Sequence, residues 1–137
     1  MDNLYKNMKM KLIEIDDTYG SLFGTITNTN NDTFKELFTK NGFSNNDLIL
    51  KEKNMYSNIL IIDNIFVDND QRGKGIGNTL MDDLFDQIDA NNIEALYLLA
   101  DIHEEQEKGF NLIKWYEGYG FETLCNTPQG PIMKLEI

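Results

Sequence analysis

A glycine-rich turn is the stretch of this sequence whose residue types point most directly to chemistry. It reads QRGKGIG over residues 71–77, so glycines alternate with other residues. Glycine lets successive backbone N–H groups point inward, because no Cβ stands in the way. Together with the unpaired donors at the start of a helix, these groups form a positive concavity suited to phosphate. Arg72 and Lys74 add charge at its rim, and we interpret the turn as a pyrophosphate site.

Two common phosphate-binding motifs do not fit this turn. No G-x-x-x-x-G-K-S/T pattern can be drawn through it, and the third glycine of G-x-G-x-x-G is missing whether counting starts at Gly73 or Gly75. The remaining alternative is an ordinary strand-to-helix turn in which the glycines are merely permissive.

The elements around the turn are those that a phosphate site of this kind needs. Residues 58–67 are apolar and β-branched, which predicts a buried strand, and a polar turn follows at 68–70. After the glycines, apolar residues recur every fourth position from Ile76 to Ile88, which predicts a helix that ends near residues 90–92.

Two motifs together resemble those of the GNAT superfamily, the acetyl-CoA-dependent N-acetyltransferases. Arg72, Gly75 and Gly77 stand at the positions of the pattern Q/R-x-x-G-x-G/A, after a strand and before a helix. Downstream, KWYEGYGF over residues 114–121 is similar to the F-Y-x-x-x-G-F ending of the last GNAT helix, with Trp115 in place of Phe. The resemblance covers roughly residue 48 to the C-terminus.

This resemblance implies a fold and a cofactor. The fold is a single mixed α/β domain over residues 1–137, with a central mixed and splayed β-sheet flanked by helices. Acetyl-CoA is the co-substrate, and no metal is implied. Its pantetheine arm pairs with the end of the central strand like an extra strand, and its pyrophosphate lies on the turn. The implied binding residues are Ile65, Phe66, Val67, Arg72, Gly73, Lys74, Gly75, Ile76, Gly77 and Asn78.

The resemblance also places Tyr116 where the family has a tyrosine that faces the cofactor sulfur. A leaving thiolate with a pKa of about 8.5 departs more easily beside an acid, and a phenol with a pKa of about 10 can donate to it. We predict this role for Tyr116. The alternative is an amphipathic core residue with its hydroxyl at the surface. The family often has N-x-x-A upstream, whereas this chain has Gly109 and Leu112 there. Asn111 could replace that asparagine only if the helix starts differently.

Two residues are candidates for binding or deprotonating the amine acceptor, and a cysteine is considered as an acyl carrier. Asp63 interrupts an apolar run, where an unpaired carboxylate would be costly, and D-N-I-F-V resembles an acidic stretch of some GNAT amine acetyltransferases. Buried beside an ammonium group, Asp63 could act as base through water or anchor the cation; otherwise it marks a bulge or a satisfied structural carboxylate. His103, the only histidine, has the ordinary pKa that suits a base at neutral pH. The alternative is an exposed loop histidine without a role in the reaction. Cys125 lies in an expected strand, and we interpret it as core rather than as an acyl carrier.

Composition narrows the class of protein. The 137 residues are enough for one domain, and 41% apolar with 26% charged residues is typical of a soluble globular protein. A net charge of −11 without a basic block argues against nucleic acid and weakly favours a cationic acceptor. No apolar run is long enough for a membrane span, and no secretory signal is visible. One cysteine excludes an internal disulfide framework, so we expect a cytoplasmic protein.

The rest of the chain completes the expected sheet. We expect strands at residues 8–15, 23–27, 47–53, 93–100, 121–125 and 132–137, with turns at 16–20 and 128–131. A capping box at Thr33 and Glu36 predicts the start of one helix, which stops at residues 41–42. The family usually has two helices between these strands, whereas this sequence predicts only one. A last helix is expected at 106–119.

The predicted activity is N-acetyl transfer from acetyl-CoA to a primary amine, by direct attack in a ternary complex. The amine could belong to a protein lysine, a protein N-terminus, a polyamine or another small molecule. One alternative is a non-catalytic GNAT-like module that binds acyl-CoA and regulates or bridges a partner. Another is an acidic interaction protein that no longer binds the cofactor. The sequence leaves the oligomeric state open, a homodimer included.

Overall fold

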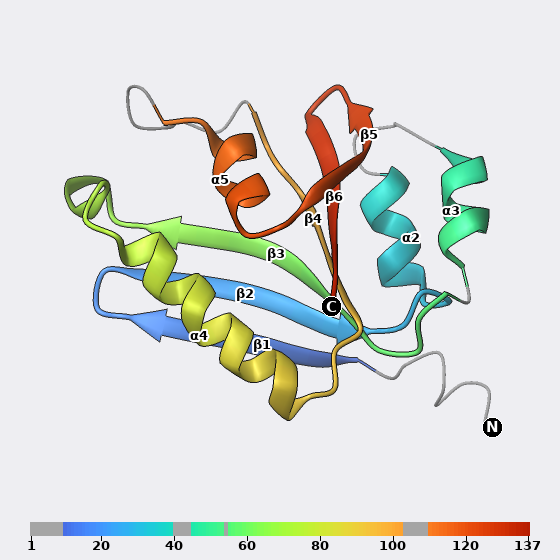
Figure 1. Ribbon diagram of the computed structural model, residues 1–137, viewed down its shortest axis with the longest axis horizontal. Coiled ribbons are helices and arrows are strands. Elements are labelled where there is room, and N and C mark those ends of the chain that lie inside the picture. The colour runs from blue at the N-terminus through green and yellow to red at the C-terminus, as the bar shows by residue number, and fades with distance from the viewer. Residues whose placement is uncertain (1–9, 40–44, 54, 103–109) are drawn as a thin grey trace.

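The central strand β3 (Ile59–Val67) organises the molecule (Figure 1). The computed structural model describes residues 10–39, 45–53, 55–102 and 110–137. Leu60 and Ile62 belong to one buried core cluster, whereas Ile59 and Ile61 belong to the other. The strand is therefore buried on both faces in its first half, which explains its continuous apolar run.

Six strands form one mixed sheet in the order β1-β2-β3-β4-β6-β5. Neighbouring strands are antiparallel except β3 and β4, which are parallel and joined through the long helix α4. The bounds of the other strands are β1 Lys11–Asp17, β2 Gly20–Thr27, β4 Ala95–Leu99, β5 Glu122–Thr127 and β6 Gly130–Glu136. This arrangement confirms the predicted mixed α/β fold.

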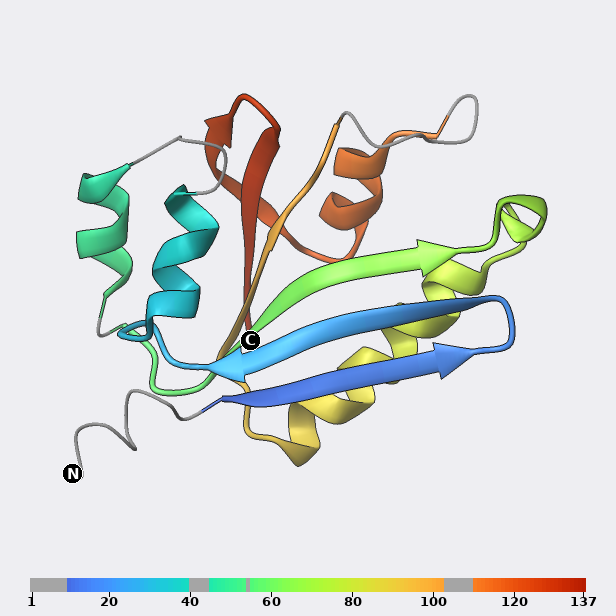
Figure 2. The same ribbon diagram turned by 180° about the vertical axis from the view of Figure 1, so that it is seen from behind.

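The parallel pair opens along its length. β3 pairs with β4 only from Ile59 to Ile62, although β3 continues to Val67 (Figures 1 and 2). Beyond that point β4 turns toward β6, while β3 stays with β2. The splayed sheet that the resemblance implied is thus present.

Helices cover the sheet from both sides. α4 (Ile76–Ala90) and α5 (Leu112–Gly118) share a core cluster with β1, β2 and β3, and the views show α4 lying across these strands (Figures 1 and 2). α2 (Asp32–Thr39) and α3 (Asn46–Glu52) pack against the other face through the second cluster. Among the described residues, no helix combines the length and the apolarity needed to cross a membrane.

The predicted strand at residues 47–53 is wrong. This segment is the helix α3, and Asn45 caps it, because its side-chain oxygen accepts a hydrogen bond of 3.1 Å from the N–H of Leu48. The apolar run Leu48–Leu50 looks like a strand, but Leu50 is exposed while Glu52 is buried, as one side of a short helix requires. Two helices therefore lie between β2 and β3, and the expected reduction to one is also wrong.

Other element ends shift by a few residues. α2 begins at Asp32 and is capped by Asn31, whose side-chain oxygen accepts a hydrogen bond from the N–H of Thr33. The helix therefore starts earlier than the predicted capping box, which placed the cap at Thr33. Helix α5 begins at Leu112, because Asn111 caps it by accepting from the N–H of Lys114 at 3.0 Å. Phe110 and Asn111 thus precede the helix that we predicted to start at 106. The polar turn after β3 contains a 3-10 helix, η2 (Asn69–Gln71).

Candidate active site

A cleft of about 480 Å³ opens where β3 and β4 diverge. Its walls come from the second half of β3, the glycine turn with the start of α4, the end of β4, and α5. Leu37 of α2 and Gln129 of the β5–β6 turn complete it. The sites that the sequence predicted at β3, at the turn and at Tyr116 therefore share one cavity.

The glycine turn has the backbone that its sequence predicted. Gly73 and Gly75 have φ values of 81° and 80°, in the left-handed region that favours glycine. Gly75 is the N-terminal cap of α4, so the first N–H groups of this helix have no partner within it. Gly73, Gly75, Gly77 and Asn78 all line the cleft. These donors and the positive end of the helix make this part of the cleft suitable for an anion.

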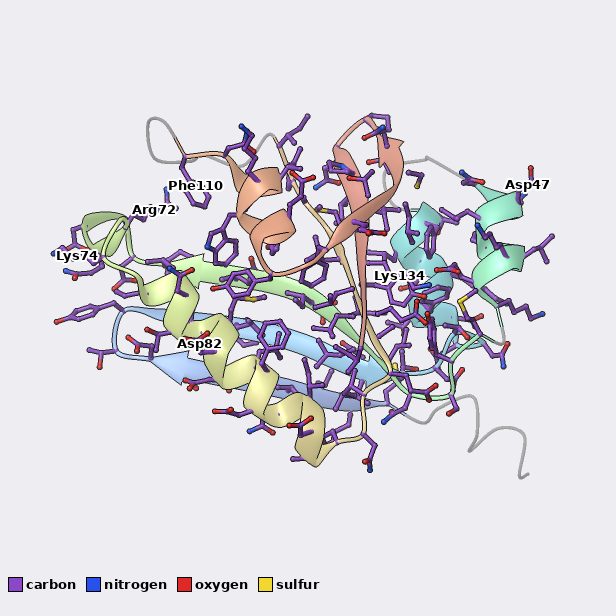
Figure 3. All side chains as sticks on the ribbon, viewed as in Figure 1. Asp47, Arg72, Lys74, Asp82, Phe110 and Lys134 are labelled. Atoms are coloured by element: carbon purple, nitrogen blue, oxygen red, sulfur yellow. The ribbon has the colours of Figure 1, made fainter. Side chains whose placement is uncertain are left out.

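The two basic residues of the turn differ in position. Arg72 lines the cleft, whereas Lys74 does not, and Lys74 Nζ donates a hydrogen bond of 3.3 Å to Gln71 Oε1. Figure 3 shows Lys74 at the outer edge of the turn and Arg72 on the side of Phe110. Arg72 is therefore the better placed of the two for an anion in the cleft.

Asn78 joins the start of α4 to α5. Its Oδ1 accepts hydrogen bonds from Trp115 Nε1 at 2.8 Å and from the hydroxyl of Tyr119 at 2.7 Å. Burial and the nearby Asp82 raise the pKa of Tyr119, so its hydroxyl keeps the proton that it donates. A Cβ on Gly77 would lie 3.3 Å from the Trp115 ring, so glycine permits this close approach. The Asn78 side chain is therefore engaged within the protein, between the start of α4 and α5.

Tyr116 lies on the α5 wall of the cleft. It is only 7% exposed, and its ring centroid is 5.1 Å from that of Trp115 and 5.7 Å from that of Phe121. The aromatic neighbours hold the ring in place on a short helix. Tyr116 is thus a buried side chain that still borders the cavity, as its predicted role requires.

Asp63 is the extra residue of a β-bulge in β3. Phe23 of β2 pairs with Asn64 and Gly24 pairs with Ile62, so Asp63 has no partner in β2. Its Oδ2 accepts a hydrogen bond of 2.7 Å from the hydroxyl of Thr25. The side chain lines the cleft and is exposed, so Asp63 is not buried, and the structure shows the bulge that the sequence analysis gave as the alternative. The bulge turns a carboxylate out of an apolar strand, which explains how the chain tolerates it there.

The end of β3 presents an open edge to the cleft. Ile65, Phe66 and Val67 pair with β2 on one side, and they lie beyond the last residue that pairs with β4. All three line the cleft. Backbone groups on this edge are available to an extended ligand, as the resemblance implied.

Several cleft residues were not predicted as site residues, and one candidate cannot be placed. His103 lies outside the described residues. Asp101, just after β4, lines the cleft and accepts a hydrogen bond of 2.6 Å from Gln129 Nε2. The sequence carried a signal for Asp101, because it follows β4, and the carboxyl ends of neighbouring parallel strands meet at one edge of a sheet. Gln129 comes from a distant turn, and the sequence carries no comparable signal for it.

Other chemistries find little support in the part of the chain that the structure describes. It contains no group of three or more His, Cys, Asp or Glu residues that could hold a metal ion. Cys125 of β5 packs beside the second core cluster and does not line the cleft, and burial raises the pKa of its thiol. A raised thiol pKa makes Cys125 a poor nucleophile.

Comparison with known proteins agrees with this geometry. The family model of the acetyltransferase (GNAT) domain matches residues 47–123, more than half of the chain. An acetyltransferase structure from Bacillus cereus is similar, with a TM-score of 0.60 and 14% identity, over 99% of this chain and 86% of that one. The ribosomal-protein-S18-alanine N-acetyltransferase from Escherichia coli gives 0.55 and 16%, over 99% and 76%.

A third similar structure is that of Arabidopsis thaliana NAA60 in complex with acetyl-CoA, with a TM-score of 0.57 and 13% identity, over 89% of this chain and 67% of that one. The search among curated proteins found no match. At these identities the solved structures establish the fold, and the family model establishes the membership. This chain belongs to the GNAT acetyltransferase family.

Proposed function

We propose that this protein is an acetyl-CoA-dependent N-acetyltransferase that transfers the acetyl group to a primary amine by direct attack. One observation carries the proposal. A single cleft combines an anion-binding turn, an open strand edge, a buried tyrosine and a carboxylate. These are the four parts that binding a long anionic thioester beside an amine would need.

The residues fit acetyl-CoA. The N–H groups from Gly73 to Asn78, with Arg72, would hold its diphosphate, and the left-handed glycines leave this surface free of side chains. The open edge at Ile65–Val67 would bind the pantetheine arm through backbone groups. When bound, acetyl-CoA supplies an acetyl group activated as a thioester. Gly77 lets the Trp115 ring of α5 pack closely against this turn, since a Cβ there would lie 3.3 Å from the ring.

Tyr116 would act as the acid. Its side chain borders the cleft, and a phenol can donate a hydrogen bond and then its proton to sulfur as negative charge develops there. Its aromatic neighbours fix the ring, so little ordering is needed during the reaction.

Asp63 would receive the acceptor. An alkylammonium group has a pKa of about 10.4, so at neutral pH nearly all acceptor molecules arrive as cations. The exposed carboxylate of Asp63, fixed by the hydroxyl of Thr25, would bind this cation in the cleft. The proton could be removed by Asp63 directly, by water or by His103. The pH dependence of the rate distinguishes these three alternatives.

The first test is a calorimetric titration of acetyl-CoA into the purified protein, followed by an assay of released thiol with pooled amines and basic peptides. We expect micromolar binding, of the order of −8 kcal/mol, and thiol release with at least one acceptor. Binding without release by any amine would favour the non-catalytic acyl-CoA module. Absence of binding would reject the assignment of the glycine turn.

A further inference from the structure

Opposite α4, the face formed by β1, the first part of β2 and the second half of β3 has no helix over it among the described elements, whereas α2 and α3 cover the first half of β3. α4 covers the opposite face, and Figure 2 looks onto the uncovered one, with α4 behind the strands. We call this surface the open sheet face. It consists of Leu12, Glu14, Asp16, Phe23, Asp63, Asn64 and Phe66.

Strand register shows that these residues share one side, except for Asp63, which the hydrogen bond from Thr25, on the same side of β2 as Phe23, places there. Ile13, Ile15 and Leu22 point into the core under α4, so their alternate neighbours point the other way. The pairing then forms cross-strand rows. Glu14 lies opposite Phe23, which lies opposite Asn64, and in the next row Asp16, Ser21 and Phe66 follow one another.

The open sheet face is both apolar and acidic. Leu12 is 78% exposed, Phe66 50% and Phe23 39%, which is unusual for large apolar side chains gathered on one surface. Three carboxylates stand among them, and the face as defined includes no lysine or arginine. Lys11, the nearest basic residue in β1, donates to Asn91 Oδ1 at the end of α4 and so points to the other side.

The open sheet face continues into the cleft. Asp63, Asn64 and Phe66 belong to both, because β3 forms the edge of the cleft. A chain that lies across the strands could therefore place an amine at Asp63 while its neighbouring residues contact Phe23 and Glu14.

We infer that the open sheet face binds a basic polypeptide segment with interspersed apolar residues, and that this segment carries the acceptor amine. The inference rests on the proposed function and narrows its substrate class. Lysine or arginine side chains would pair with Glu14 and Asp16, and apolar side chains would cover Leu12 and Phe23. The overall charge of −11 steers such a segment toward the protein.

Two other occupants fit less well. A second copy of this chain would bring the carboxylates of two acidic faces together, and like charges in contact oppose association. A small amine bound at Asp63 would leave most of the face unused, because β1 lies two strands away from β3, about 10 Å at the usual strand spacing.

The test compares two acceptors that share a reactive group. One is a ten-residue peptide of alternating lysine with leucine and phenylalanine, and the other is n-butylamine, which has the carbon chain of a lysine side chain. The face variant is Glu14→Lys with Asp16→Lys. The matched control is Asp86→Lys with Asp89→Lys, which makes the same change in net charge on exposed residues of α4.

We expect kcat/KM for the peptide to fall about tenfold or more in the face variant and to change less than about twofold in the control. We expect kcat/KM for n-butylamine to be unchanged in both variants, and the affinity for acetyl-CoA to be unchanged as well. Equal loss in the control would mean general charge attraction only and would overturn the inference. So would an unchanged peptide reaction in the face variant, or a native dimer in sedimentation equilibrium that the face variant abolishes.

Binding separates this inference from the proposed function. Fluorescence anisotropy of the labelled peptide measures its affinity without any turnover. Peptide binding that the face variant weakens and the control keeps supports the face even if no amine is acetylated, in which case only the proposed activity fails. If n-butylamine is acetylated but the native protein does not bind the peptide, the activity stands and the open sheet face is rejected.

Discussion

At the scale of single residues, the bulge at Asp63 shows how one extra position creates a site in an apolar strand. Without it, the alternation of β3 would continue unbroken, and Ile65 and Val67 would not return to the core under α4. The bulge therefore keeps the end of the strand packed under α4, while Asp63 stays exposed on the other face.

Asp63→Asn tests the carboxylate while it keeps the shape of the side chain. We expect KM for the acceptor to rise about tenfold or more with a smaller change in kcat, because an amide cannot bind a cation as a carboxylate does. Steady-state kinetics with varied amine measures this. If instead kcat falls and the acidic limb of the pH–rate profile flattens, Asp63 is the base rather than the anchor.

Tyr116→Phe removes one hydroxyl from the α5 wall of the cleft. We expect kcat to fall about 100-fold or more, since the developing charge on sulfur loses its proton donor. Calorimetry should show acetyl-CoA affinity nearly unchanged, because the ring and its aromatic contacts remain. Tyr19→Phe is the matched control, as Tyr19 is exposed and does not line the cleft. An unaltered kcat for Tyr116→Phe would remove this residue from the mechanism.

At the scale of elements, the start of α4 depends on a backbone conformation rather than on a side chain. Gly75 occupies the N-cap position with φ of 80°, and no side-chain cap bond is formed there. The first residues of α4, whose N–H groups have no partner within the helix, line the cleft. Asn78 then fixes α5 against this turn, so the anion-binding part and the tyrosine wall are coupled.

Gly75→Ala tests this conformation. A Cβ at Gly75 meets nothing within 4 Å, so any loss comes from the left-handed backbone alone. We expect stability to fall by about 1–2 kcal/mol in urea unfolding, with weaker acetyl-CoA binding by calorimetry. Gly75→Asn should lose less stability than Gly75→Ala, since asparagine tolerates the left-handed backbone region. Gly118→Ala, also in open space but without a positive φ, should be neutral or slightly stabilising. Equal behaviour of the two alanine variants would contradict the argument.

At the scale of the whole molecule, a buried polar cluster joins distant parts of the chain on the face opposite α4. Glu52 of α3 accepts hydrogen bonds from Lys134 Nζ at 2.8 Å and from the Tyr97 hydroxyl at 3.0 Å. The side chain of Glu52 is 2% exposed and that of Lys134 14%. These contacts tie α3, which lies between β2 and β3 in the chain, to β4 and β6.

Lys134→Met should destabilise the protein strongly. It leaves the Glu52 carboxylate buried without its cation, which typically costs about 3–5 kcal/mol. Chemical unfolding measures this loss. The double variant with Glu52→Leu should recover much of the stability, because replacing both partners by apolar groups leaves no buried charge. A double variant as unstable as the single one would show that packing, rather than charge, is responsible.

The same cluster predicts a loss of stability at alkaline pH. Burial and the Glu52 charge raise the pKa of Tyr97 above its ordinary 10.0. Burial lowers the pKa of Lys134, but the hydrogen bond and charge of Glu52 outweigh this and leave it above 10.5. The unfolded chain therefore binds fewer of these protons above about pH 10 than the folded chain does.

Stability from these groups is complete below about pH 10 and is lost as the pH rises through their folded-state values. Urea unfolding between pH 8 and about pH 11.5 should show this decline. Tyr97→Phe should make the decline shallower. A flat profile in the native protein would contradict the assignment.

Particular residues show how far sequence reasoning reached. The β3 strand, the glycine turn and helix α4 were predicted nearly to the residue, because their signals are local: an apolar run, positive-φ glycines and a four-residue repeat. α3 was mistaken for a strand because Leu48, Ile49 and Leu50 suit either element. Only tertiary contacts decide between them, and here Glu52 finds Lys134 and Tyr97 in the sheet.

The sequence by itself thus determined the fold class, the family motifs and the identity of Tyr116 and Asp63 as candidates, since each depends on residue type and short spacing. Tertiary structure decided where the sheet opens, with β4 leaving β3 after Ile62, that Asp63 is exposed at a bulge, and that Asp101 and Gln129 join the cleft. It also decided which sheet face stays uncovered. These features depend on pairings between residues far apart in the chain. The sequence offered the bulge only as one alternative and signalled Asp101 only through the strand order, and it carries no local pattern for Gln129 or for the uncovered face.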